Sequence, residues 1–488
     1  MLREFPFSPC SARGPLYRAT VSRAIGMPIE FPAKPPALSL KWERVRNAEF
    51  AIVNCGKTRK RRADMSMNRR TFLKSSGGAA TVAAIGGCAS VGGSGPKVVV
   101  VGGGYGGATA AKYLKMWGPH LNVTLVERNE EFISCPISNL VLGGSQTMKD
   151  ITVSYDTLAK KYGINVVRGE ASAVDVEKKV VRMANGDSLP FDRVILSPGI
   201  DFLFEDIPGL NNAAAQQRVM HAWKAGPQTV ALRKQLESMK DGGVVAISIP
   251  TAPYRCPPGP YERACQIANY FKTAKPRSKV LVLDANDDVT SKGPLFKKAW
   301  ADRYAGIIDY RPKHTVVDVD AATNTLKFEF NDDVKAQVLN VLPAMRAGDI
   351  AVKSGLATAN KRWCEVDFLT FESKAAKNIH VLGDAIQIAA LMPKSGHMAN
   401  QHAKTCAAAV IALLGGQAPN PAPIYNNTCY SFVSPDEVVH VASVHAYNAG
   451  AKTMTVVAGA GGVSAAASPL EGAYAFGWAR NIWADALA

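Results

Sequence analysis

Short apolar runs alternate with glycine-rich turns and helical stretches in the first folded part of the chain. Residues 97–101 read Lys-Val-Val-Val-Val, a β-branched run typical of a buried parallel strand. A glycine-rich turn follows at 102–107, and residues 108–117 then have the pattern of a helix. A second apolar run at 122–126 ends on Glu127. This order predicts a strand, a turn, a helix and a second strand, the beginning of an α/β fold.

The glycines of this turn have the spacing of the dinucleotide-binding fingerprint. In that motif Gly102 permits the tight turn, Gly104 lets the backbone approach a pyrophosphate, and Gly107 lets the helix pack closely on the strand. The helix N-terminus favours the anionic pyrophosphate. Glu127 lies twenty residues beyond Gly107, where an acid can bind the ribose hydroxyls. The pattern predicts a dinucleotide site but does not separate FAD from NAD.

Later segments continue the alternation. The predicted elements are a helix at 154–162, a hairpin at 174–189 around Asn185-Gly186, strands at 191–199 and 379–382, and a helix at about 395–414. The last strand ends in Gly383-Asp384-Ala385. This strand and helix resemble the flavin disulfide-reductase superfamily, and the resemblance implies that Gly383 and Asp384 complete an FAD site, with Asp384 on the ribityl chain. It also implies a discontinuous FAD-binding domain, residues 96–208 and 345–415.

Residues 209–344 are expected to form a second Rossmann-like domain. Its predicted strands are 243–249 and 279–284, with a helix at 261–274 between them. The loop at 250–260 holds one glycine and several prolines, which lack the N–H donors that cradle a phosphate. We therefore expect no NAD(P)H site here, so electrons must enter from another donor.

The charge of the chain is uneven. The net charge is +17, yet residues 1–74 hold 16 Lys and Arg against 5 Asp and Glu. The basic excess therefore lies mainly ahead of the folded part, and we expect no nucleic-acid partner. No apolar stretch in the remainder reaches the length that a membrane span requires.

The residues ahead of the first strand have the layout of an export signal. Residues 68–74 read Asn-Arg-Arg-Thr-Phe-Leu-Lys and precede a small-residue apolar stretch, the pattern of a twin-arginine signal peptide. We assign this signal to residues 65–95 and predict a periplasmic protein. Residues 1–64 are interpreted as a disordered extension from a mis-set start codon. Residues 85–88 also resemble a lipoprotein box, so lipidation of Cys88 stays open.

Nine cysteines are present, without a CxxC or CxxCH motif, which argues against a zinc ribbon or a covalent haem on this chain. Cys135 lies in Ile-Ser-Cys-Pro-Ile-Ser-Asn, Cys256 in Cys-Pro-Pro-Gly-Pro-Tyr-Glu-Arg and Cys429 in Asn-Thr-Cys-Tyr. With the leader, the glycine motif, Gly-Asp-Ala and Met-Pro-Lys-Ser-Gly at 392–396, these segments resemble the flavoprotein subunit of flavocytochrome c sulfide dehydrogenase. The resemblance covers nearly the whole mature chain.

That resemblance assigns roles to three cysteines. Cys135 is implied to form a thioether to the 8α-methyl group of FAD, where a buried inert cysteine is the alternative. Cys256 and Cys429 are implied to pair as a redox-active disulfide beside the flavin, which hydrosulfide can open to a persulfide and a thiolate. A purely structural disulfide is the alternative. The sequence does not say which sulfur attacks the flavin.

Two charged residues near these motifs each allow two interpretations. Glu262, six residues after Cys256, could act as a general base or could simply favour a helix N-terminus. Lys394, before the predicted helix at 395, could stabilise the reduced flavin or could be solvated. No metal site is predicted.

The expected fold is α/β, with two Rossmann-like FAD/NAD(P)-type domains, the FAD domain discontinuous, and a C-terminal α+β interface domain at 416–488. The expected function is FAD-dependent oxidation of sulfide to sulfur or polysulfide, with electrons passed to a c-type cytochrome subunit. The alternative is a sulfide:quinone oxidoreductase, which needs an apolar membrane-facing surface that the C-terminal tail does not clearly provide. A flavin-binding subunit without catalysis would need no redox-active disulfide.

Overall fold

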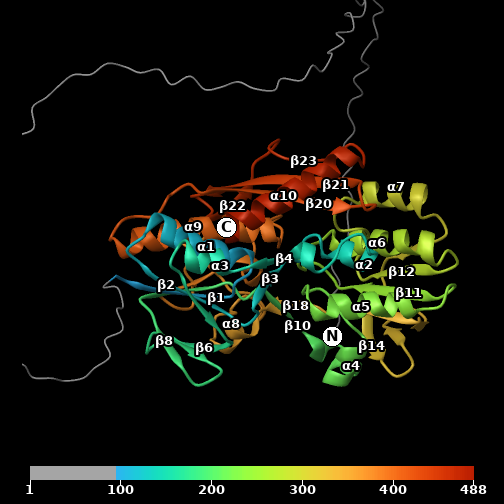
Figure 1. The fold of residues 1–488 in the computed structure, drawn as a ribbon, viewed down its shortest axis with the longest axis horizontal. Helices are drawn as coiled ribbons and strands as arrows, with labels where there is room; N and C mark the ends of the chain where they lie inside the picture. Colours follow the sequence, from blue (N-terminus) through green and yellow to red (C-terminus); the bar gives the residue numbers. More distant parts are fainter. Residues whose placement is uncertain (1–94) are drawn as a thin grey trace, which may run out of the picture. The chain divides into compact units, whose positions relative to one another are not determined.

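The structure, a computed structural model, describes residues 95–488 (Figure 1). The extension at 1–64, nearly all of the predicted signal peptide at 65–95 and Cys88 lie outside the described residues. Between residues 95 and 488, no helix is both long and apolar enough to cross a bilayer.

The glycine motif opens a five-stranded parallel sheet. Its order is β19-β9-β1-β2-β5, and its strands are β1 (Lys97–Val101), β2 (Asn122–Glu127), β5 (Asn165–Arg168), β9 (Arg193–Leu196) and β19 (Ile379–Val381). The Val side chains of β1 are almost fully buried, as the β-branched run predicted. Because β19 pairs with β9, the Gly-Asp-Ala segment joins the sheet that contains the glycine motif.

Two long helices pack on one another beside this sheet, α1 (Tyr105–Trp117) and α9 (Gly396–Leu414). Both predicted helices are confirmed, and α1 starts three residues earlier than expected because Gly106 and Gly107 lie in its first turn. The predicted helix at 154–162 is wrong at both ends. Ser154 closes strand β4, and only α3 (Asp156–Lys160) is helical.

The predicted hairpin is a three-stranded antiparallel sheet. Its strands are β6 (Ala171–Asp175), β7 (Val180–Met183) and β8 (Ser188–Pro190). The Asn185-Gly186 turn joins β7 to β8, and Gly186 has a φ of +95°, which suits glycine. Helix α8 (Asp349–Lys353) packs on β6.

The second parallel sheet has the order β13-β12-β11-β17. Its strands are β11 (Val244–Ile249), β12 (Lys279–Asp284), β13 (Ile308–Arg311) and β17 (Val338–Val341), and its helices are α5 (Pro227–Ser238), α6 (Gly259–Ala274) and α7 (Gly293–Arg303). A small antiparallel sheet adjoins it, made of β14 (Val316–Asp320), β15 (Thr325–Phe328) and β16 (Val334–Lys335). The predicted strand–helix–strand unit is confirmed.

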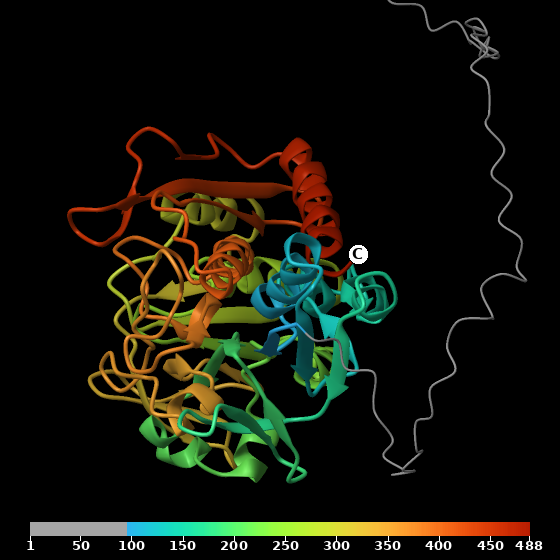
Figure 2. The ribbon, with the colours of Figure 1, turned by 90° about the vertical axis from the view of Figure 1, so that its left-hand side faces the viewer.

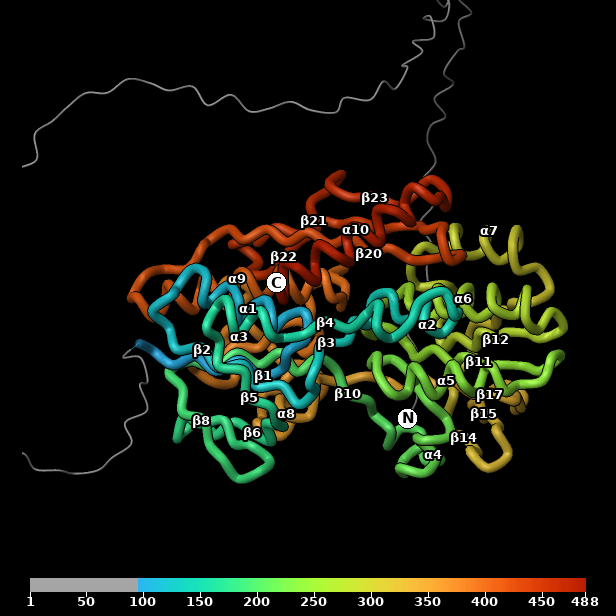
Figure 3. The backbone as a smooth tube through the Cα atoms, in the orientation of Figure 1, coloured from blue at the N-terminus to red at the C-terminus, as the bar shows by residue number. Residues whose placement is uncertain are grey.

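Short elements connect the two sheets. The chain leaves the first sheet through β10 (Ile200–Phe202) and returns through its antiparallel partner β18 (Met345–Ala347), as the trace in Figure 3 shows. Helix α2 (Ser138–Gly143) packs against α5 and α6, which belong with the second parallel sheet; each parallel sheet with its helices is called a unit below. The remaining short elements are β3 (Glu131–Ile133), β4 (Thr152–Ser154), α4 (Ala213–Arg218) and the 3-10 turns η1 (Lys149–Ile151), η2 (Phe204–Asp206), η3 (Pro208–Leu210) and η4 (Gly383–Ala385).

The C-terminal segment forms a separate antiparallel layer, visible above α9 in Figure 2. It contains β20 (Ile424–Phe432), β21 (Val438–Asn448), β22 (Thr453–Val456), β23 (Gly462–Val463) and α10 (Pro469–Leu487). Strand β20 packs on both α9 and α6, and α10 packs on α1. This layer therefore closes over both parallel-sheet units.

Helix α10 is tied to the first unit by side-chain hydrogen bonds. Trp483 Nε1 donates to Tyr105 Oη at 3.0 Å, and Tyr113 Oη donates to Asp485 Oδ1 at 2.6 Å. Lys404 of α9 forms an ion pair with the same Asp485 at 2.8 Å. The last helix is thus joined to the helix that follows the glycine motif.

Candidate functional site

A cavity of about 220 Å³ lies where the two parallel-sheet units and the C-terminal layer meet. Its walls come from the glycine turn, the β3–α2 loop, the β11–α6 loop, the N-terminus of α9, strand β20 and helix α10. The lining includes Gly104, Cys135, Cys256, Glu262, Gly383, Asp384 and Cys429 from the predicted site residues.

The glycine turn leaves space where a pyrophosphate would bind. Gly102 has a φ of +95°, and a Cβ there would lie 2.4 Å from the Ser197 carbonyl oxygen. A Cβ on Gly107 would lie 1.7 Å from the Gly102 oxygen, so the close packing of helix on strand needs glycine. A Cβ on Gly104 would meet nothing within 4 Å. Gly104 is the N-cap of α1 without a side-chain cap, so the first N–H groups of the helix are free for an anion.

Glu127 lies at the end of β2 beside this turn rather than in the cavity lining. Its Oε2 accepts a hydrogen bond from the Gly103 N–H at 2.6 Å, and its Oε1 accepts from the Asn129 N–H at 2.8 Å. The carboxylate is 8% exposed. It therefore holds the glycine turn, and its remaining lone pairs are those available to ribose hydroxyls.

Asp384 fits a group with hydroxyl donors. Its Oδ1 is buried and has no hydrogen-bond partner among the described residues. Burial raises the pKa of the carboxyl group, against the opposing effect of Arg255 and Lys394. Since an unpartnered buried oxygen is costly, a hydroxyl-bearing ligand such as a ribityl chain would satisfy it. The open Gly104 turn and this oxygen together fit FAD.

Cys135 lies in the loop between β3 and α2, on the cavity wall. The backbone N–H of Ala225 donates to its Sγ at 3.4 Å, and the thiol lies 3.7 Å from the Trp223 carbonyl oxygen. The guanidinium of Arg255 also hydrogen-bonds to this thiol. Cys135 is partly exposed, in contrast to the fully buried Cys265 and Cys406.

Cys256 and Cys429 come together on the cavity wall. Both are present as free thiols, and they are hydrogen-bonded to one another. The hydrogen bond to Cys429 and burial raise the pKa of Cys256. The hydrogen bond from Cys256 lowers the pKa of Cys429 to about 6, assisted by the charge of Lys292. The pair is therefore electrostatically asymmetric.

The local backbone presents these two cysteines from different elements. Cys256 has a φ of +57°, an unfavourable conformation for a residue with a Cβ, and its N–H donates to the Lys394 oxygen at 2.9 Å. Cys429 lies in β20, opposite Val441 of β21. The loop after β11 and the C-terminal layer thus each contribute one sulfur.

Glu262 lies in the first turn of α6 and is 7% exposed. Burial raises the pKa of its carboxyl group to about 8, although Lys292 acts in the opposite direction. It hydrogen-bonds with Asn139 and interacts with the charges of Cys256 and Cys429. A carboxyl group with this pKa can exchange a proton near neutral pH.

Lys394 is buried behind the Gly-Asp-Ala turn and does not line the cavity. Its Nζ donates to the backbone oxygens of Asp384 at 2.9 Å and Ile386 at 2.6 Å, and it lies 3.6 Å from the centre of the Trp363 ring. Burial lowers its pKa to about 7. Lys394 is therefore not solvated, and its contacts hold the turn that carries Asp384.

Sequence reasoning missed several residues of the site. Arg255 and Trp223 line the cavity, and Lys292 lies behind Cys429. The position of Arg255 beside Cys256 in the sequence was a usable signal. Nothing in the sequence indicated Lys292, because it precedes a different helix and reaches the cysteines only through the fold.

A groove on the surface adjoins the cavity. It runs between α9 and α10, and His397, Tyr430 and Trp478 line both the groove and the cavity. The rings of His397 and Trp478 lie 5.8 Å apart, and those of Tyr430 and Trp478 lie 6.2 Å apart. Three aromatic side chains thus separate the cavity from the surface.

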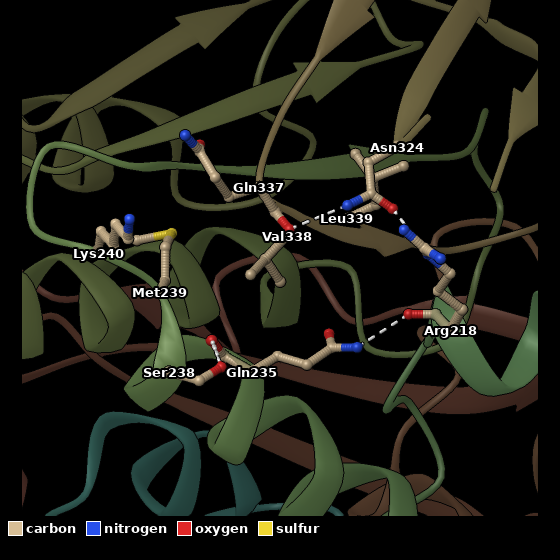
Figure 4. A pocket seen from close by; sticks show the side chains of 9 residues that line it. All are labelled: Arg218, Gln235, Ser238, Met239, Lys240, Asn324, Gln337, Val338 and Leu339. Carbon is tan, nitrogen blue, oxygen red and sulfur yellow. Dashed lines mark hydrogen bonds between the residues drawn. The ribbon is translucent and has the colours of Figure 1, made fainter. Parts of the chain in front are cut away.

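A further hollow, of about 460 Å³, lies near the end of α5 and the start of β17 (Figure 4). Its polar side chains bond to nearby backbone. Gln235 Nε2 donates to the Arg218 oxygen at 2.9 Å, and Asn324 Nδ2 donates to the Gln337 oxygen at 3.1 Å. Its lining has no cysteine, histidine or carboxylate, and it lies at the amino ends of the strands. Ligands of parallel sheets bind at the opposite ends.

Comparison with protein families gives matches along most of the chain. Residues 96–238 match the family of pyridine nucleotide-disulphide oxidoreductases. Residues 229–343 match the central part of the sulfide dehydrogenase [flavocytochrome c] flavoprotein chain, and residues 421–487 match the flavin-binding part of flavocytochrome c sulphide dehydrogenase. Residues 66–86 match the twin-arginine translocation signal, which confirms the predicted export by that route to the periplasm.

Two relatives give matches of different extent. The flavoprotein chain of sulfide dehydrogenase [flavocytochrome c] from Chlorobaculum thiosulfatiphilum is 58% identical over 37 residues, which cover 8% of this chain and 77% of that relative. The mitochondrial sulfide:quinone oxidoreductase of Dictyostelium discoideum is 24% identical over 277 residues, 54% of this chain. That match spans 59% of the Dictyostelium protein.

Solved structures share the fold. The sulfide:quinone oxidoreductase of Aquifex aeolicus aligns with a TM-score of 0.67 at 18% identity, covering 80% of this chain and 91% of that one. The NAD-dependent persulfide reductase of A. fulgidus aligns with a TM-score of 0.55 at 15% identity, covering 80% of this chain and 77% of that one. These likenesses confirm the predicted α/β fold with Rossmann-type units.

Proposed function

The chain belongs to the family of flavocytochrome c sulfide dehydrogenase flavoprotein chains, and from this membership we propose that it oxidises sulfide in the periplasm with FAD. The proposed products are zero-valent sulfur or polysulfide, and the proposed acceptor is a c-type cytochrome subunit. The observation that carries this proposal is the contact between Cys256 and Cys429 on the wall of the cavity that fits FAD.

We place FAD between the glycine turn and the Gly-Asp-Ala turn. The free N–H groups at the start of α1 would hold the pyrophosphate, Glu127 the ribose and Asp384 the ribityl hydroxyls. Cys135 would carry the covalent link, and its partly exposed thiol on the cavity wall supports that role. Bound FAD supplies an acceptor for two electrons.

The residues around the cysteine pair account for the sulfur chemistry. Glu262 takes a proton from hydrogen sulfide, and the resulting hydrosulfide attacks one sulfur of the oxidised pair. One S–S bond forms and one breaks, so one cysteine becomes a persulfide and the other a thiolate. The buried, raised-pKa carboxyl of Glu262 lies close enough to both cysteines to interact with their charges.

Replacement of Cys256 by Ser tests the proposal. We expect anaerobic sulfide to bleach the flavin absorbance of the wild-type protein and to leave the Cys256→Ser protein essentially oxidised, because no disulfide can form. Cys265→Ser is the matched control, since Cys265 is fully buried outside the cavity and Ser leaves an acceptor for Trp300. Bleaching of the Cys256→Ser protein at the wild-type rate would refute the proposed chemistry.

The covalent link is tested separately. After acid precipitation, we expect the flavin to remain with the polypeptide in the wild-type protein and to enter the supernatant in the Cys135→Ser protein. Cys364→Ser, at a buried cysteine away from the cavity lining, should retain the flavin as the wild type does. Release of the flavin from the wild-type protein would exclude attachment.

The groove between α9 and α10 is the proposed docking place of the cytochrome. His397, Tyr430 and Trp478 line both the cavity and this groove, so they connect the cavity to the surface there. Tyr474 is 54% exposed on the groove. We expect Tyr474→Asp to slow cytochrome c reduction without slowing flavin bleaching by sulfide. Equal slowing of both rates would place the docking surface elsewhere.

Sulfide:quinone oxidation is the second candidate, favoured by the Dictyostelium and Aquifex likenesses. The flavin-binding match at 421–487, which belongs to the flavocytochrome family, favours the cytochrome. Parallel assays of the purified protein with a soluble quinone and with cytochrome c decide between them. If the quinone is reduced faster than cytochrome c, a quinone is the acceptor in place of the cytochrome.

A further inference from the structure

Lys292 places a buried ammonium group directly behind Cys429. The side chain is 8% exposed, and its Nζ donates to the Cys429 backbone oxygen at 2.8 Å and to Ser431 Oγ at 2.8 Å. Both acceptors lie in β20, whereas Lys292 itself is the N-cap of α7 in the second unit. The fold therefore brings this cation to the cysteine from another domain.

The ammonium group of Lys292 is unusual for a buried charge. No Asp or Glu of residues 95–488 forms an ion pair with it, although a buried charge is normally paired. A buried cation without an ion pair, bonded to the strand that carries a cysteine of the cavity wall, points to a functional role.

The charges around the two cysteines differ. The charge of Lys292 acts to lower the pKa of Cys429. Burial lowers the pKa of Lys292 itself, whereas the charges of Cys429, Glu262, Cys256 and Glu471 raise it. Cys256 interacts with Glu262, which opposes ionisation of its thiol, and with Arg255, which favours it. Arg263 acts on Glu262 from the same helix. The net result is a cysteine pair in which negative charge is favoured at Cys429.

We propose that Lys292 fixes the polarity of the Cys256–Cys429 pair, so that hydrosulfide opens the disulfide at Cys256 and Cys429 leaves as the thiolate. In this step the sulfur of hydrosulfide bonds to Cys256 Sγ, the disulfide bond breaks, and its electron pair goes to Cys429 Sγ. The hydrosulfide proton stays on the new persulfide. A disulfide is opened faster when the sulfur that leaves is the better stabilised anion. The proposal rests on the proposed function, and Lys292 acts in it as a positioning residue.

The thiol pKa tests this role without turnover. The flavin-loaded protein is reduced, desalted under nitrogen and alkylated with iodoacetamide across a pH series, and the Cys429 peptide is quantified by mass spectrometry. In Lys292→Met we expect the alkylation midpoint of Cys429 to rise by about one to three pH units, because a nearby opposite charge is lost. Lys292→Arg keeps the charge and should stay near the wild-type midpoint.

Lys298→Met is the matched control, because Lys298 lies on the same helix with its side chain 69% exposed. Because Lys292→Met leaves two acceptors in β20 without this donor, its melting temperature and flavin content are measured first. Should Lys292→Met lose its flavin, Ser431→Ala removes one acceptor of the ammonium and should raise the same midpoint by less. Equal Cys429 midpoints in wild type and in every folded variant at 292 and 431 would overturn the proposal.

The position of the persulfide tests the polarity itself. After one equivalent of sulfide and rapid alkylation, we expect the extra sulfur on the Cys256 peptide in the wild type and on both cysteine peptides in Lys292→Met. An extra sulfur on Cys429 in the wild type would overturn the proposal. A wild-type flavin that sulfide does not bleach would instead refute the proposed function, and the alkylation midpoints would still report on Lys292.

Discussion

The loops that follow the first strand of each parallel sheet occupy equivalent places and have opposite character. After β1 the loop consists of three glycines, leaves open space at Gly104 and presents free N–H groups at the start of α1. After β11 the loop contains prolines, including Pro258 at the N-cap of α6, and it presents Cys256 to the cavity. One strand–loop–helix unit is therefore suited to hold a dinucleotide, and the other supplies a reactive group. The architecture fixes where a loop lies, and the residues in it decide what it does.

The largest effect is expected in the glycine loop. Gly107→Ala would place a Cβ 1.7 Å from the Gly102 oxygen, so we expect loss of nearly all bound flavin together with a lower melting temperature. Gly104→Ala is the matched comparison, since its Cβ meets nothing within 4 Å. The flavin-free Gly104→Ala protein should have the same melting temperature as the flavin-free wild type. It should nevertheless bind less flavin than the wild type does. The ratio of flavin absorbance to protein absorbance measures the bound flavin in both variants. Full flavin content in Gly107→Ala would contradict the assignment of this loop.

A second effect is expected in the proline-loop unit. Glu262→Gln removes the proposed base, so we expect flavin bleaching by sulfide to slow by about 10²–10⁴-fold. In the wild type the rate should rise as the pH increases through about 8, the pKa to which burial raises Glu262, because the base must be ionised. In the Glu262→Asp protein the bleaching rate should still rise with pH. A Gln variant with the wild-type rate and pH profile would exclude the role.

The same carboxyl group makes a prediction about stability. Its pKa is raised from 4.5 to about 8 in the folded protein, so folding favours the protonated form and stability is lost as the pH rises across that range. The melting temperature of the wild type relative to Glu262→Gln should therefore fall between about pH 5 and about pH 8. A difference that is constant with pH would show that the carboxyl group is not desolvated.

A smaller effect is expected at the second turn of the cofactor site. In a Cys135→Ser background, where bound flavin can exchange, Asp384→Ala should weaken FAD affinity by about 10- to 100-fold, since a hydrogen bond to a charged acceptor is lost. Titration of the flavin-free proteins followed by fluorescence measures the two dissociation constants. Asp192→Ala, at a carboxylate remote from the cavity lining that bonds Lys97, is the control. Equal affinities would remove Asp384 from the binding site.

The smallest effect is expected from NADH. The proline loop offers few N–H donors, so NADH should not bleach the flavin at a measurable rate, and Pro260→Ala should not change that. Anaerobic mixing with NADH, followed at the flavin absorbance, is the measurement. Rapid bleaching would show that the two loops are less different than their sequences indicate.

The sequence predicted the parts of the fold that depend on local pattern. The β-branched run of β1 and the Gly102–Gly107 spacing set a strand and a turn within a few residues, and both are found where expected. The predicted helix at 154–162 was wrong because Ser154 pairs with Glu131 in a short antiparallel ribbon. Pairing of that kind depends on a distant segment, which the local pattern does not contain.

The residues of the site likewise divide into those that the sequence indicated and those that only the fold brings together. Cys135, Cys256 and Cys429 came from a resemblance, since nothing in their spacing brings 256 to 429. Lys394 was expected near the flavin or in solvent, and it is instead buried against two backbone oxygens and Trp363. Lys292 was not foreseen, because only the tertiary fold brings its ammonium group, at the N-cap of α7, to the Cys429 backbone oxygen in β20. Charge and burial at a site are therefore properties of the tertiary fold.

The hydrogen bonds between α10 and α1 have a consequence for biosynthesis. Tyr105 beside the glycine turn accepts a hydrogen bond from Trp483, which lies 378 residues later in the chain. Synthesis runs from the N-terminus, so the pocket wall stays incomplete until that helix is released from the exit tunnel. The wall beside the glycine turn is therefore completed only when α10 packs on α1.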